Sequence, residues 1–87
     1  METIFLDGRR LARREEAHNY LSTILSLPDY YGRNLDALWD LMTEWSRPTR
    51  LVVCHLEAMG VCGEAILGTL EDAAAENPLL QVERLDE

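Results

Sequence analysis

The stretch LPDYYGRNLDALWD, residues 27–40, combines an ordered loop with the first turns of a helix. Its first half contains Pro, two Tyr and Gly, which favour a loop that turns the chain at 27–33. Asn34 follows, and its side chain can accept a hydrogen bond from a free backbone N–H, as a helix N-cap does. The stretch therefore predicts a helix that begins at Asn34 and continues to Trp45.

This predicted helix, 34–45, sorts its side chains onto two faces, because successive residues turn by about 100° around the axis. We expect the apolar face to pack on a core and the polar face to meet solvent, with Trp39 on the border between them. The apolar face comprises Leu35, Leu38, Leu41, Met42 and Trp45, and the polar face comprises Asp36, Asp40, Thr43 and Glu44.

The rest of the chain alternates predicted strands and helices. A short apolar strand at 3–6 ends at Asp7-Gly8, where glycine accepts a positive φ at little cost. Apolar residues at helical spacing predict a helix at 13–26, and Pro28 ends it. The later elements are a central strand at 51–54, a turn or irregular helix at 57–63, a helix at 64–76 and an edge strand at 79–85.

This order of elements predicts an α/β layer fold, in which parallel strands are joined by right-handed crossovers. A chain of 87 residues can build one compact core and is too short for two. We therefore expect a single domain over residues 1–87.

The charge balance restricts the partners that this chain can bind. Sixteen acidic and eight basic residues give a formal net charge of −8, which repels nucleic acid and anionic membranes and attracts basic surfaces. No apolar run approaches the roughly 20 residues that span a bilayer, and residues 1–5 lack the features of a signal peptide. Cys54 and Cys62 have neither disulfide nor zinc-site spacing. These features predict a cytoplasmic protein without cofactor or metal.

No group of residues has the spacing of a catalytic site. Neither His18 nor His55 has a Ser, Cys or carboxylate at a diagnostic distance along the chain, and no glycine-rich phosphate loop is present. We expect His18 to be a solvated helix residue and His55 to end the central strand. The sequence therefore predicts that the protein is not an enzyme.

A stripe of carboxylates on the predicted helix 34–45 is the strongest candidate for function. Asp36, Asp40 and Glu44 lie four residues apart, so they stand one turn above another, and like charges at this spacing destabilise an isolated helix by about 0.2–0.5 kcal/mol per pair. Most such stripes are solvated faces of amphipathic helices. Here Trp39 cannot be wholly buried, and Tyr30 precedes the helix. Because aromatic residues beside charges anchor many interfaces, a partner-binding surface is the second interpretation.

Residues 27–40 closely resemble the signature of the barstar family, whose members carry Leu-Pro, Tyr-Tyr-Gly, an Asn cap and Asp-Ala-Leu-Trp-Asp at these relative positions. The resemblance is strongest from Leu27 to Trp45, and the chain length and order of elements agree elsewhere. It implies a small three-stranded parallel sheet packed with three to four helices. It also implies an intracellular inhibitor of a barnase-type ribonuclease, acting as a toxin antidote or immunity protein in a 1:1 complex and monomeric when free.

The resemblance also implies which residues contact the partner. The family's two helical aspartates fall on Asp36 and Asp40, of which the second is expected to stand where substrate phosphate would sit. A glutamate on the family's later helix falls on Asp72, which is one methylene shorter. Arg33 stands where the best-known inhibitor has an acid, so it would oppose a basic enzyme rim. The remaining positions that resemble the contact surface are Tyr30, Gly32, Asn34, Leu35, Trp39, Thr43 and Trp45.

Several of these positions also have structural explanations. Gly32 suits a backbone turn, Asn34 a cap, and Trp45 the core, so dual roles are expected for Asn34 and Trp45. The alternative function is an acidic binding module for another basic protein or toxin that is not a ribonuclease. Substrate analogues should compete with this chain for a ribonuclease partner, and they should not compete for a partner of the alternative kind.

Overall fold

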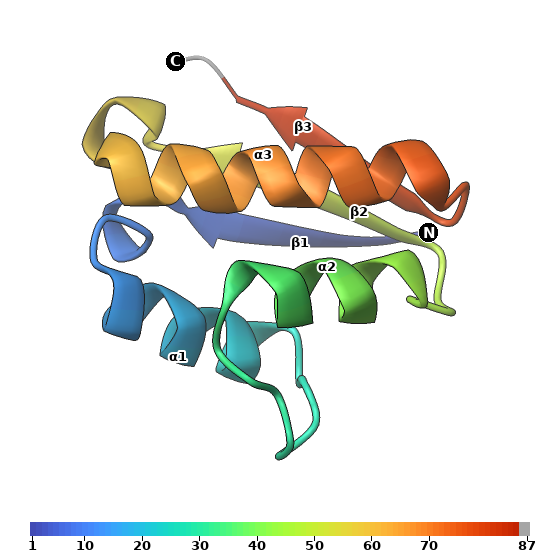
Figure 1. Ribbon diagram of the computed structural model, residues 1–87. Coiled ribbons are helices and arrows are strands. Elements are labelled where there is room, and N and C mark those ends of the chain that lie inside the picture. Colours follow the sequence, from blue (N-terminus) through green and yellow to red (C-terminus); the bar gives the residue numbers. More distant parts are fainter. Residues whose placement is uncertain (86–87) are drawn as a thin grey trace.

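A computed structural model describes residues 1–85, in which a three-stranded parallel sheet is covered by helices (Figure 1). The short 3-10 turns η1 and η2 follow the first and second strands. The elements are β1 (Glu2–Asp7), η1 (Gly8–Arg10), α1 (Arg14–Ile24), α2 (Leu35–Thr43), β2 (Thr49–Cys54), η2 (Leu56–Ala58), α3 (Gly60–Glu76) and β3 (Leu80–Arg84). The predicted α/β fold is thereby confirmed.

The sheet has the order β1-β2-β3, so the prediction that the apolar run at 51–54 is central is confirmed. In the register, Phe5 pairs with Val52 and Val52 with Glu83. Val52 is buried between its neighbours, which explains why β2 is apolar on both faces. Phe5 remains 59% exposed on the outer strand β1.

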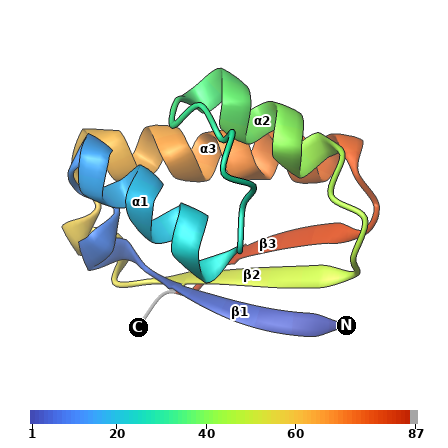
Figure 2. The same ribbon diagram turned by 90° about the horizontal axis from the view of Figure 1, so that it is seen from below.

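The helices α1, α2 and α3 all lie on one face of the sheet and run in the same direction, opposite to the strands (Figure 2). Their N-terminal ends therefore lie near the same end of the molecule. The core lies between helices and sheet. Its fully buried large side chains are Leu6, Leu11, Leu21, Leu25, Leu38, Met42, Leu51, Val53, Met59, Ile66, Leu67 and Leu70.

The helix α3 begins earlier than the sequence predicts. It starts at Gly60, whose φ is +64°, and runs for 17 residues. The sequence pattern placed 57–63 in a turn or short irregular helix, which the structure has only in the 3-10 helix Leu56–Ala58. The second glycine of that segment, Gly63, does not break the helix because it packs against the Met59 side chain and the Leu11 carbonyl. No helix within residues 1–85 combines the length and apolar character that crossing a membrane requires.

Gly8 is required by close packing rather than by its backbone conformation. The expected positive φ at Gly8 is absent. Instead, a Cβ at this position would overlap the His55 carbonyl oxygen and lie 2.6 Å from that of Cys54 and 2.8 Å from the Met59 Cγ atom. Gly8 thus lets the chain pass directly beneath the end of β2.

Gly8→Ala is therefore expected to lower the free energy of unfolding by about 1–3 kcal/mol, because backbone atoms must move to admit the methyl group. Gly68→Ala is the matched control. A Cβ at Gly68 meets nothing within 4 Å, so alanine in this helix should stabilise the chain by about 0.5–1 kcal/mol. Urea denaturation of both variants checks the opposite signs, and equal effects would contradict the packing argument.

Candidate partner-binding surface

The loop before α2 ends in a side-chain cap. The Asn34 Oδ1 atom accepts a hydrogen bond from the Ala37 backbone N–H at 2.8 Å, and its Nδ2 donates to the Gly32 carbonyl at 3.2 Å. The predicted N-cap is thus confirmed. The left-handed residue of the turn is Arg33, with a φ of 53°, rather than Gly32. The cap fixes where α2 begins, and hence which side chains face outward.

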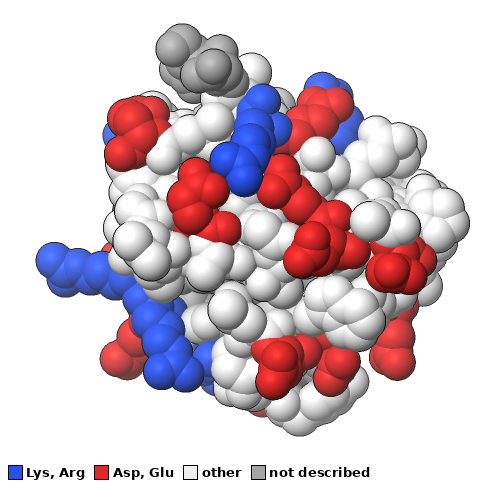
Figure 3. Space-filling model, turned by 45° about the horizontal axis from the view of Figure 1, so that its top comes forward, with Lys and Arg blue, Asp and Glu red and all other residues white. Residues whose placement is uncertain are grey.

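Three carboxylates follow one another along the outer side of α2. Asp36, Asp40 and Glu44 are all exposed, and Thr43 is half-buried with its hydroxyl donating to the Asp40 carbonyl at 3.1 Å. Asp72 is exposed on α3, which packs beside α2 (Figure 1). Acidic side chains recur over the face of the molecule that Figure 3 shows.

These carboxylates are not neutralised by the chain itself. Within residues 1–85, the ion pairs involve other acids, such as Glu71 with Arg84 at 3.0 Å and Glu83 with Arg50 at 2.6 Å. None involves the carboxylates on α2 or Asp72. The basic side chains visible in Figure 3 lie mostly at its left margin and upper edge. The negative field over α2 is therefore available to an external cation.

Aromatic side chains flank the carboxylates. Tyr30 is 81% exposed and Trp39 is 40% exposed, as expected for residues at an interface border. Trp45 is half-buried, its Nε1 donates to the Thr49 Oγ1 at 2.8 Å, and the Arg47 guanidinium lies 4.5 Å from its ring centroid. Trp45 therefore packs against the rest of the chain, which is the structural one of the two roles predicted for it.

Leu35 differs from its predicted position. The periodicity placed it on the buried face of α2, yet it is 38% exposed, whereas Leu38 and Met42 are fully buried. The reason is its place in the first turn of α2, where its side chain lines a surface groove instead of the core. This exposure makes Leu35 accessible to a partner.

His18 was predicted to be a solvated residue, and this prediction is wrong. It is 3% exposed, and a hydrogen bond of 2.5 Å joins its Nδ1 atom to the hydroxyl oxygen of the buried Tyr31. Burial, with Arg14 and Arg33 nearby, lowers the pKa of His18 below its ordinary value of 6.5. Burial raises the pKa of Tyr31 to about 12. This neutral pair ties the loop 27–33 to α1.

The lowered pKa of His18 predicts a loss of stability in mild acid. As the pH falls below 6.5, His18 becomes protonated in the unfolded chain but stays neutral to a lower pH in the folded chain. The free energy of unfolding therefore decreases as the pH decreases, by at most about 1.4 kcal/mol per pH unit. Urea denaturation at pH 7.5 and 5.5 measures this effect. His18→Gln should reduce the difference between the two pH values, and an unchanged difference would assign it to other groups.

Arg33 is directed toward α1. Its Nε atom donates to the Asn19 Oδ1 at 2.8 Å, which orients the guanidinium. The positive charge beside the proposed contact surface therefore has a structural partner.

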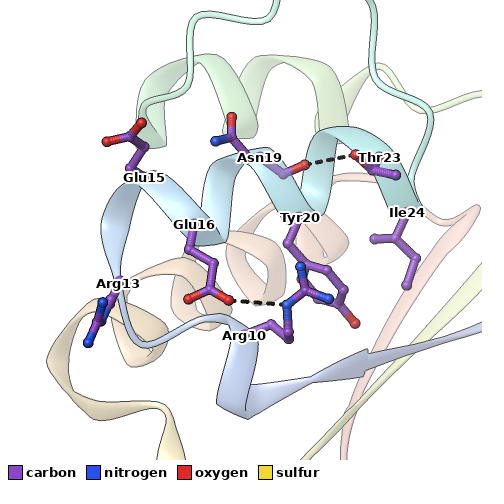
Figure 4. A pocket seen from close by; sticks show the side chains of 8 residues that line it. All are labelled: Arg10, Arg13, Glu15, Glu16, Asn19, Tyr20, Thr23 and Ile24. Carbon is purple, nitrogen blue, oxygen red and sulfur yellow. Dashed lines mark hydrogen bonds and ion pairs between the residues drawn. The ribbon is translucent and has the colours of Figure 1, made fainter.

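A second hollow lies on the outer side of α1 (Figure 4), with a volume of about 770 Å³. In it the Arg10 guanidinium stacks 4.6 Å from the centroid of the Tyr20 ring and is paired with Glu16 at 3.2 Å. The hollow contains none of the residues predicted to bind a partner. Within residues 1–85, no three His, Cys, Asp or Glu residues cluster as a metal site requires.

The fold and this surface define a small α/β protein with exposed carboxylates along α2. Residues 1–82 match the family model described as "Barstar (barnase inhibitor)". The chain is also 40% identical over 81 residues to the protein named "Putative ribonuclease inhibitor YrdF" of Bacillus subtilis (strain 168), covering 87% of this chain and 89% of that protein. The chain belongs to the barstar family, a family of non-enzymatic ribonuclease inhibitors.

Proposed function

We propose that this chain inhibits a barnase-type ribonuclease by placing the carboxylates of α2 where the enzyme binds RNA phosphate. The observation that carries the proposal is the row Asp36, Asp40 and Glu44, exposed and without ion pairs within residues 1–85. A ribonuclease concentrates Arg, Lys and His to hold phosphate. A carboxylate held among them makes charge-assisted hydrogen bonds and offers no bond to cleave.

Asp40 is the central residue of this mechanism. It lies in α2 one turn after Asp36 and one turn before Glu44, with the half-exposed Trp39 beside it. Trp39 and Tyr30 supply apolar contact area around the charged centre, which excludes water and strengthens the charge pairs. Asp72 on α3 provides a further negative charge for the rim of the enzyme.

The remaining positions have supporting roles. Gly32 and Asn34 shape the loop that enters the enzyme, and Leu35, Thr43 and Trp45 extend the surface along both ends of α2. The complex is 1:1 with a chain that is monomeric when free. The inhibitor acts in the cytoplasm, where it protects the cell from a toxin ribonuclease.

Inhibition of barnase at low and at moderate salt tests this function. We expect stoichiometric inhibition that weakens as salt rises, because the charges that steer association are screened. A substrate-analogue nucleotide should compete with the inhibitor for the enzyme. Binding to barnase without nucleotide competition would indicate a docking site away from the phosphates. An absence of binding would favour the alternative, an acidic module for a basic protein that is not a ribonuclease.

A further inference from the structure

A groove of about 860 Å³ is lined by residues at or near the N-terminal ends of α1, α2 and α3. These three helices all begin toward the left of Figure 2. Its apolar lining includes Leu35 from α2 and Val61, Ala65 and Ile66 from α3. Ile66 is 1% exposed, whereas Val61 is 90% exposed. The groove thus has an apolar floor and an accessible apolar rim.

Such a rim is unusual in this chain. Val61 is the most exposed of the large apolar side chains that the structure describes. Exposed apolar rims with a buried apolar floor are the usual form of a pocket that receives a partner side chain. The geometry is therefore that of a receptor for an apolar group.

The groove is continuous with the proposed contact surface. Asn34, Leu35 and Asp36 belong to both, because the first turn of α2 forms one wall. Asp36 also places a negative charge at the border, and Arg14 from α1 contributes a positive one. Neither has an ion pair within residues 1–85. If a ribonuclease binds to α2 with a basic group facing Asp36, its adjacent surface will lie over this groove.

We propose that the bound ribonuclease inserts one aliphatic or aromatic side chain into this groove, beside the basic group that faces Asp36. This inference rests on the proposed function and extends its surface from α2 to the start of α3. It makes Val61 and Ala65 specificity-determining residues. Ribonucleases with an apolar side chain at this place bind tightly, and those with a charged one there bind weakly, because the floor would desolvate the charge.

The test uses Val61→Ser, which removes the apolar rim, and Ala65→Trp, which fills the groove. Phe5→Ser is the matched control, because Phe5 is also exposed but lies on the sheet. With barnase as the probe, we expect Val61→Ser to raise Kd about fivefold and Ala65→Trp about tenfold or more, mainly through faster dissociation. Phe5→Ser should change Kd by less than about twofold. Thermal denaturation confirms that each variant is folded.

Three outcomes would overturn the inference. If both groove variants bind as the native chain does while Asp40→Ala does not, the groove lies outside the contact and the proposed function survives. If the native chain sediments as a dimer that Val61→Ser dissociates, the groove receives a second copy of this chain. If the native chain does not bind barnase at all, the proposed function and this inference both fail.

Discussion

Asp40→Ala is expected to abolish most of the inhibition of a barnase-type ribonuclease. Truncating one member of a hydrogen-bonded charge pair buried in an interface costs about 2–5 kcal/mol, which corresponds to a rise in Kd of about 30-fold to 4,000-fold. Much of this cost arises because the cationic groups of the enzyme stay desolvated without a counterion. The effect should appear mainly in the dissociation rate, which stopped-flow binding measures directly.

Controls for Asp40→Ala separate the site from the overall charge. Glu15→Ala removes the same charge from an exposed position on α1 and should alter Kd only slightly, through weaker steering. Asp40→Asn keeps the shape and removes the charge, so it should bind nearly as weakly as the alanine variant. Equal losses in Glu15→Ala and Asp40→Ala would show that net charge, rather than phosphate mimicry, drives the binding.

Elements that depend on local pattern were predictable from the sequence. The cap at Asn34, the two faces of α2 apart from Leu35, and the central position of β2 follow from spacing within a few residues, and the structure confirms them. Most of the predicted site lies in one continuous segment, 30–45, so its members were bound to be neighbours. The family signature supplied their proposed roles.

Elements that depend on contacts between distant segments were not predictable. His18 is buried because Tyr31, 13 residues later, covers it. The spacing of apolar residues within one helix does not predict which other segment of the chain will cover a side chain. Leu35 is exposed because the first turn of α2 borders a groove. Val61 and Ala65 were absent from the predicted site. Val61 lies in the glycine-rich segment 57–63, which indicated a turn or irregular helix, and Ala65 lies at the start of the predicted helix 64–76. Apolar residues between glycines were the signal that could have suggested a helix there.

The carboxylate row makes α2 unfavourable in isolation. Asp40 and Glu44 lie toward its C-terminal end, where the negative end of the helix dipole repels them, and its last turn contains no basic residue. The helix is also only nine residues long, which is too short to be stable alone in water. Its stability must come from packing and from groups that satisfy its last carbonyls.

Asn77 supplies such a group from another part of the chain. Its side chain is buried, and its Nδ2 atom donates to the Met42 carbonyl at 3.0 Å and to the Trp45 carbonyl at 2.9 Å. Its Oδ1 accepts from the Leu79 backbone N–H at 3.0 Å. The sequence analysis placed Asn77 only in the position that follows the predicted helix 64–76. In the structure, the same residue also caps the end of α2.

Asn77→Ala is therefore expected to lower the free energy of unfolding by about 2–5 kcal/mol, because it removes three hydrogen bonds and leaves buried carbonyls undersatisfied. In a domain of this size, the loss corresponds to a fall in Tm of about 10 °C or more. Asn77→Asp keeps the acceptor for Leu79 but replaces the donor with a negative charge beside two carbonyls, so it should destabilise at least as much. An unchanged Tm in both variants would mean that solvent satisfies these carbonyls. In that case the row of like charges on α2 would be supported by core packing alone.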